Sequence, residues 1–192
     1  ALFTLLLSTT AFAEQPWQHV EFGALAPTGT TTMKLEDFLL DGEHDQVAQP
    51  LSVVQGVGIG VFTQGGPGQT LDPGESITLT FAPIPAHSLS LELLPYMAGN
   101  VAIQYLDRRG RVLVNQTQEL FGSLAAISVS PNLEADIPVH AVRVISQSTN
   151  LLVGSITYRR ITFRPGDTLL FQANAQEPND EDGPYFYGVA GL

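Results

Sequence analysis

The chain of 192 residues is 44% hydrophobic and contains no cysteine. This composition fits one globular domain and excludes disulfides, thiolate nucleophiles and cysteine-ligated metals. Its formal net charge of −11 argues against nucleic acid and anionic membranes, because both need clustered Lys and Arg. The acidity lies at the ends: residues 1–45 hold seven acidic residues and residues 167–192 hold five.

Residues 1–13 have the pattern of the end of a secretion signal. An apolar run from Leu2 to Leu7 is followed by Ala11-Phe12-Ala13, the small-x-small sequence that signal peptidase cleaves. The run is shorter than the about 20 apolar residues of a membrane-spanning helix. We therefore expect a secreted, periplasmic or cell-surface protein without a transmembrane segment; the alternative is a buried N-terminal element that is retained.

Residues 14–50 form an acidic N-terminal segment. A threonine run precedes Lys34, and threonine can cap a helix. The sequence therefore predicts a short helix from Lys34 to Leu40, the one helical element that we expect.

Residues 51–173 predict strands, because apolar and polar residues alternate with a period of two. Examples of the apolar positions are Ile77, Leu79 and Phe81, then Leu89, Leu91 and Leu93, then Val101, Ile103 and Tyr105. Gly and Pro turns separate these runs, and Gly110 is placed to form the tip of a hairpin. The fold class that this indicates is all-β, an antiparallel β-sandwich of jelly-roll-like form. Residues 174–192 are expected to add an acidic loop and a C-terminal strand or tail to the same domain.

The glycines of Gly56-Val57-Gly58-Ile59-Gly60 suggest two readings. A phosphate-binding loop requires a helix after the glycines, whereas Val61-Phe62 and a Gly-Pro turn follow here. We predict instead a strand that packs closely against another backbone.

The segment Leu71-Asp72-Pro73-Gly74-Glu75-Ser76-Ile77-Thr78-Leu79-Thr80-Phe81 resembles a recurring segment of jelly-roll-like domains in exported bacterial proteins. Many of those proteins belong to the PEP-CTERM-sorted surface group. The Tyr105–Arg111 hairpin fits the same layout, and the resemblance extends over about residues 50–163. It implies a β-sandwich that acts at the cell surface or in the extracellular matrix of a bacterium.

Two acidic clusters are candidate calcium ligands, because calcium takes six to eight oxygen ligands. Their residues are Asp41, Glu43 and Asp45 in the first cluster and Asp180 and Asp182 in the second. The alternative is two solvated acidic loops that keep an exported protein in solution. The cofactor prediction is accordingly none or Ca²⁺.

Aromatic side chains are the candidate carbohydrate ligands, since a sugar ring stacks on an exposed aromatic ring. The sequence offers Trp17, Tyr96, Tyr158, Tyr185 and Tyr187, and we single out Trp17, Tyr185 and Tyr187. Arginines group at 108–111 and 159–164, either as an ordinary charged surface or as a patch for an acidic partner. The four histidines, His19, His44, His87 and His140, are scattered.

No catalytic residue is nominated, because no Gly-x-Ser-x-Gly or His-Glu-x-x-His motif occurs. The leading hypothesis is an exported, non-catalytic protein that acts by binding or assembly at the cell surface or in the extracellular matrix, with polysaccharide or further copies of itself as candidate partners. The alternatives are a carbohydrate-binding module-like protein and a polysaccharide-active hydrolase or lyase.

Overall fold

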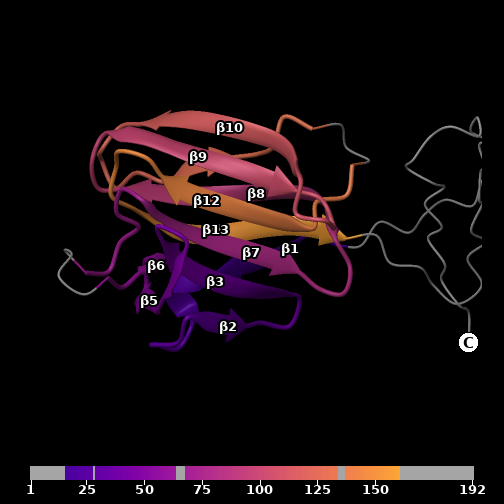
Figure 1. Ribbon diagram of the computed structural model, residues 1–192, viewed down its shortest axis with the longest axis horizontal. Coiled ribbons are helices and arrows are strands. Elements are labelled where there is room, and N and C mark those ends of the chain that lie inside the picture. The colour runs from indigo at the N-terminus through magenta and orange to yellow at the C-terminus, as the bar shows by residue number, and fades with distance from the viewer. Residues whose placement is uncertain (1–15, 28, 64–67, 134–136, 161–192) are drawn as a thin grey trace, which may run out of the picture. The chain divides into compact units, whose positions relative to one another are not determined.

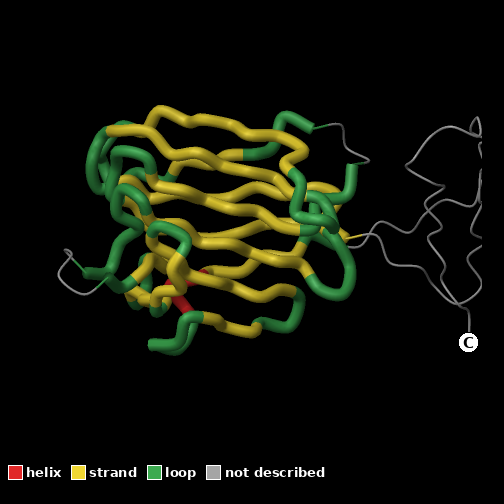
Figure 2. Tube along the Cα trace, viewed as in Figure 1, coloured by secondary structure: helices red, strands yellow, loops and turns green. Residues whose placement is uncertain are grey.

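The computed structural model describes residues 16–27, 29–63, 68–133 and 137–160, which form two antiparallel β-sheets packed as a sandwich (Figure 1). Figure 2 shows that strands dominate these residues; their one helical element is a single 3-10 turn, Phe22–Ala24. The all-β, jelly-roll-like sandwich predicted from the alternating pattern is confirmed. Within the described part of the chain, no helix is long and apolar enough to cross a membrane.

The first sheet has the strand order β11-β8-β13-β6-β5, and β1 also pairs with β13. Its strands are β1 (Gln18–Glu21), β5 (Leu51–Val54), β6 (Gly58–Val61), β8 (Ala86–Pro95), β11 (Ile127–Val129) and β13 (Leu151–Arg160). β13 is the central strand: β8 pairs with it along nearly its whole length, while β1 and β6 share its other edge.

The second sheet has the order β10-β9-β12-β7-β3-β2, with β4 paired to β3. Its strands are β2 (Thr32–Lys34), β3 (Phe38–His44), β4 (Val47–Gln49), β7 (Glu75–Phe81), β9 (Gly99–Leu106), β10 (Val112–Leu120) and β12 (Ala141–Ser146). β9 and β10 form the predicted hairpin, and Gly110 at its tip has a φ of +76°, which glycine adopts without a Cβ penalty.

The core lies between the sheets and is built from alternate residues of their strands. Leu89, Leu91 and Leu93 of β8 are buried against Ile77 and Leu79 of β7, whereas the residues between them are only partly buried. This is the arrangement expected when one face of each sheet is covered and the other faces solvent.

Two expectations for the N-terminal part differ from the structure. The predicted helix from Lys34 to Leu40 is wrong: Lys34 ends β2, and Phe38–His44 is strand β3. Phe38 and Leu40 are buried at period two and pair with β7, so burial of alternate residues in a sheet overrides the weak helical signal. The sandwich therefore starts at β1, earlier than residue 51.

An ion pair between a buried arginine and a partly buried aspartate, whose side chain is 22% exposed, joins the two sheets at one end of the sandwich. Arg160, 8% exposed at the end of β13, donates from Nη1 to Oδ1 of Asp37 at 2.5 Å, and the hydroxyl of Tyr158 donates to Oδ2 at 2.6 Å. Asp37 precedes β3 in the other sheet, and the rings of Phe38 and Tyr158 meet edge to face at 5.9 Å. Polar and aromatic contacts thus fix the same junction.

Glycines in β6 allow a second segment of backbone to lie against the first sheet. A Cβ built on Gly60 would be 2.3 Å from the carbonyl oxygen of Gln69, and one on Gly58 would be 2.6 Å from that of Val153. The prediction of a strand packed closely against another backbone is confirmed.

Replacing Arg160 should destabilise the protein strongly. Arg160→Met leaves the carboxylate of Asp37 without its charged partner, so we expect a loss of about 3 kcal/mol in the free energy of unfolding. Urea denaturation measures this loss. The matched control is Arg111→Met, which breaks the exposed pair with Asp107 and should cost at most about 1 kcal/mol; equal losses in the two variants would contradict the assigned role.

A methyl group at Gly60 should also be costly, because the segment at Gln69 would have to move away. We expect Gly60→Ala to lower the free energy of unfolding by about 2 kcal/mol, as overpacking typically does. Gly29→Ala is the control, since a Cβ at Gly29 meets nothing within 4 Å. Thermal unfolding of the two variants compares them, and an unchanged midpoint for Gly60→Ala would rule out the close contact.

Candidate functional site

The site is the outer face of the first sheet, defined as the outward side chains of β1, β13, β8 and β11. Successive side chains of a strand point to opposite faces of the sheet. Because Leu89, Leu91 and Leu93 point into the core, Ser90 and Glu92 point outward. Strand pairing then places outward residues side by side: Thr157 of β13 is opposite Ser90, and His19 of β1 is opposite Thr157. The outer face is therefore a polar surface carried on paired strands.

Trp17 lies directly before β1 at one end of this face. The guanidinium carbon of Arg159 lies 4.7 Å from the centre of the indole ring, a distance typical of a cation–π contact. Trp17 is nevertheless 50% exposed. Arg159 thus holds the indole on one side while the other side remains open to a ligand.

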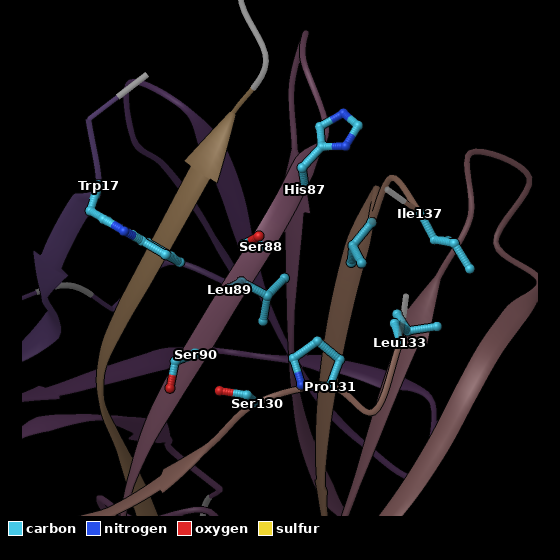
Figure 3. A pocket seen from close by; sticks show the side chains of 10 residues that line it. Trp17, His87, Ser88, Leu89, Ser90, Ser130, Pro131, Leu133 and Ile137 are labelled. Atoms are coloured by element: carbon cyan, nitrogen blue, oxygen red, sulfur yellow. The ribbon is translucent and has the colours of Figure 1, made fainter. Parts of the chain in front are cut away.

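A hollow of about 260 Å³, the first hollow, opens beside Trp17 (Figure 3). Trp17 extends across β13 toward β8, and the residues opposite it come from the segment after β11. The lining residues are Trp17, His87, Ser88, Leu89, Ser90, Ser130, Pro131, Leu133, Ile137 and Val139. Among the described residues, this lining holds no Asp, Glu, Lys or Arg and combines apolar surface with hydroxyl groups and the imidazole of His87.

Short hydroxyl side chains continue the face away from the first hollow. Ser90 and Ser128 are hydrogen-bonded through their Oγ atoms at 2.7 Å, and Nδ1 of His19 is 2.8 Å from Oγ1 of Thr157. Further along, the hydroxyl of Ser155 donates to Oε2 of Glu92 at 3.3 Å. These groups are held in place by one another and can still donate or accept further hydrogen bonds.

A second hollow, of about 470 Å³, lies at the other end of the outer face. Tyr96 follows β8 directly and is 41% exposed. The hollow is lined by Val54, Gln69, Thr70, Tyr96, Met97 and Asn150. Like the first hollow, it has an aromatic ring beside uncharged hydrogen-bonding groups.

A buried carboxylate supports the polar side of the second hollow. Oδ1 of Asp72 accepts hydrogen bonds from Thr70 and from the amide of Asn150, and the backbone N–H of Asp72 donates to Oε2 of Glu75 at 2.8 Å. Glu75 is 1% exposed. Burial raises the pKa of Glu75 above its ordinary value, although the hydrogen bonds from Asp72 and Thr63 oppose this effect.

The structure places Trp17, but not the other predicted carbohydrate ligands. Tyr185 and Tyr187 lie outside the described residues. Tyr158 is 2% exposed and its hydroxyl is bonded to Asp37, so it belongs to the core junction and offers no stacking surface.

The three described calcium candidates already have neighbours. Asp41 accepts a hydrogen bond from Thr32 at 2.6 Å, Glu43 is paired with Arg143, and Asp45 lies 3.5 Å from the ring of His44. Among the described residues, no group of three or more His, Asp or Glu side chains is placed to hold a metal ion. Asp180 and Asp182 lie outside the described residues, and the two-cluster calcium site stays a prediction.

The arginines do not form one patch. Arg111 pairs with Asp107 at the hairpin tip, Arg159 stacks on Trp17, and Arg160 is buried with Asp37. The histidines are likewise spread over the fold, with His19 on the outer face and His87 at the first hollow.

Sequence reasoning missed the hydroxyl groups of the site. In the sequence, Ser88 and Ser90 fit the polar half of an amphipathic strand. Ser155 and Thr157 alternate with apolar residues in the same way along β13. The available signal was that short hydroxyl residues recur at alternate positions of both strands, beside the charged Glu92 of β8 and Arg159 of β13.

Neither a family model nor a curated protein matches the sequence. Several solved structures resemble the fold. A family 29 carbohydrate-binding module has a TM-score of 0.45 and 10% identity, over 76% of this chain and 90% of that chain. A variant of such a module complexed with cellulohexaose gives 0.45 and 11%, over 74% and 91%. Another, complexed with mannohexaose, gives 0.45 and 10%, over 76% and 93%.

The raised pKa of Glu75 predicts a defined pH dependence. A group whose pKa is higher in the folded than in the unfolded protein favours folding at low pH, and this contribution is lost as pH rises from 4.5 through the folded pKa. Glu75→Gln cannot ionise. The variant should therefore gain stability relative to the parent protein as pH rises above 4.5, the ordinary value from which the pKa of Glu75 is raised.

Urea denaturation at several pH values measures this difference. Glu119→Gln on the edge strand β10 corrects for the change in net charge. If the difference between Glu75→Gln and the parent protein is constant with pH, the carboxylate does not carry the burial cost assigned to it.

Proposed function

We propose that the protein is a non-catalytic carbohydrate-binding module that acts outside the cytoplasm and binds an uncharged glycan on the outer face of the first sheet. The observation that carries the proposal is Trp17: an exposed indole, held by Arg159, beside a hollow lined by serine hydroxyls. A sugar ring offers C–H groups to an aromatic face and hydroxyls to polar side chains. Small-molecule sites combine the same apolar and polar elements.

The charges of the face favour a neutral glycan. In the part of the chain that the structure describes, the first hollow has no Asp, Glu, Lys or Arg in its lining. Beyond it, the outer face carries the carboxylates of Glu21 and Glu92, and its guanidinium, that of Arg159, lies against the ring of Trp17. An acidic polysaccharide would need a surplus of basic groups to offset the loss of its hydration.

Binding is favoured over catalysis because the polar groups of the face lie on an open sheet surface. Electrostatic catalysis depends on groups in a site that excludes water, and the row from His19 to Ser128 runs across the solvent side of four paired strands. Self-assembly, the other half of the leading hypothesis, remains a prediction.

Trp17 is the single tryptophan of the chain, so the intrinsic fluorescence of the protein reports directly on the proposed site. Titration with neutral glucans, mannans, xylans and galactans should shift and change the emission for at least one of them, because a stacked sugar displaces water from the indole. Isothermal calorimetry then measures the dissociation constant. Chromatography of the same mixtures detects any released sugar, which would contradict the non-catalytic assignment.

Trp17→Ala should weaken binding at least about tenfold, since truncation of a central aromatic residue in an interface commonly costs about 2 kcal/mol or more. The matched control is Phe121→Ala, which removes another exposed aromatic ring, 69% exposed, that lines neither hollow. Equal affinities for Trp17→Ala and the parent protein, or an emission spectrum unaffected by the whole glycan panel, would refute the proposal.

A further inference from the structure

Two hollows of the same chemistry lie at the two ends of one sheet face. The first combines Trp17 with the hydroxyls of Ser88 and Ser90, and the second combines Tyr96 with Asn150 and Thr70. As far as the described residues line them, neither hollow contains Asp, Glu, Lys or Arg. A ligand group that fits one hollow is therefore of the same class as a group that fits the other.

Strand β8 connects the hollows. Ser88, Ser90, Glu92 and Leu94 alternate with the buried leucines and Pro95, and Tyr96 continues the outward series. The backbone N–H of Tyr96 donates to the carbonyl of Asn150 at 2.7 Å, so pairing with the β13 side extends to this residue. Ser88 and Tyr96 are eight residues apart, which corresponds to about 26 Å along a strand.

The surface between the hollows carries short side chains with hydrogen-bonding groups. Ser90, Ser128 and Thr157 present short side chains there, whereas Ser155 is 5% exposed and Leu94 lies over Gly154. The hydrogen bonds among these hydroxyl residues, and those to His19 and Glu92, fix the hydroxyl positions. A ligand lying along β8 would pass the ordered hydroxyls of Ser90, Ser128 and Thr157 and, nearer the second hollow, the side chains of Glu92 and Leu94. Groups that are already ordered cost less entropy on binding than mobile side chains.

We infer that the ligand is the interior of a linear, uncharged polysaccharide chain that runs parallel to β8 and β13, with one sugar on Trp17 and a distant sugar of the same chain on Tyr96. This inference rests on the proposed function and adds to it the length and direction of the ligand. A terminal monosaccharide would fill one hollow and leave the other unoccupied. A continuous chain engages both rings, and the second contact gains from the high effective concentration that the first provides.

The experiment measures affinity against oligosaccharide length. Cello-, manno- and xylo-oligosaccharides from disaccharide to octasaccharide are titrated into the full chain, with Trp17 emission as the readout. For a series that binds, the affinity of the parent protein should rise until the oligosaccharide is long enough to reach Tyr96. Tyr96→Ala should leave the short members unchanged and weaken the longest about fivefold, the loss expected for one aromatic contact.

Two variants control for the loss of an exposed side chain. Tyr96→Phe retains the ring and should keep the gain with length, and Phe121→Ala should behave as the parent protein. The thermal midpoint of each variant checks its folding.

The outcomes separate the two proposals. If short oligosaccharides change the emission but affinity does not grow with length, or if Tyr96→Ala retains the whole gain, the extended chain is wrong and the Trp17 site stands. If no oligosaccharide or polysaccharide changes the emission, the carbohydrate-binding function itself is wrong.

Discussion

The whole structure depends on burying one face of the first sheet. Leu89, Leu91 and Leu93 reach the core only in one register of β8, and in that register Ser90 and Glu92 must face outward. A slip of one residue would exchange these two sets completely. The hydrophobic core therefore determines which polar groups form the outer face, and the same alternation on β13 turns Thr157 outward while Ile156 and Tyr158 are buried.

Polar contacts at the two ends keep this face in shape. At one end, Arg160 is buried against Asp37 while its neighbour Arg159 turns outward and supports Trp17, and the register of β13 against β8 shifts between these two residues. At the other end, Glu75 holds Asp72, which in turn holds Thr70 and Asn150. The second hollow is thus connected to the buried carboxylate of Glu75, and Arg159, which supports Trp17, is next to the ion pair of Arg160 with the partly buried Asp37. Groups oriented by such a supporting shell are more rigid than groups on free loops.

The sequence predicted the strands well where alternation was strong and failed where it was short. Ile77 to Phe81 and Leu89 to Leu93 specify their strands because their apolar residues recur at period two. The helix predicted for residues 34–40 was wrong, because this range includes only the first part of β3, which is too short to show a period of two. Its partner strand β7 also lies far along the chain. The site was predictable only at its aromatic residues, Trp17 and Tyr96. Trp17, Ser90 and Tyr96 lie on one face because β1 pairs with β13 and β13 pairs with β8. Pairing between strands that are distant in the sequence cannot be predicted from a local pattern of residues.

Charge distribution completes the account of the face. Acidic residues are concentrated in residues 1–45 and 167–192, whereas the body is balanced. Within the described part of the acidic N-terminal stretch, Asp37 is buried with Arg160, and Asp41 and Glu43 belong to the other sheet. The net charge of −11 therefore favours solubility without setting the chemistry of the outer face. Recognition there must come from ring stacking and hydrogen bonds, whose strength depends on fixed geometry, and a sheet held at both ends supplies that geometry.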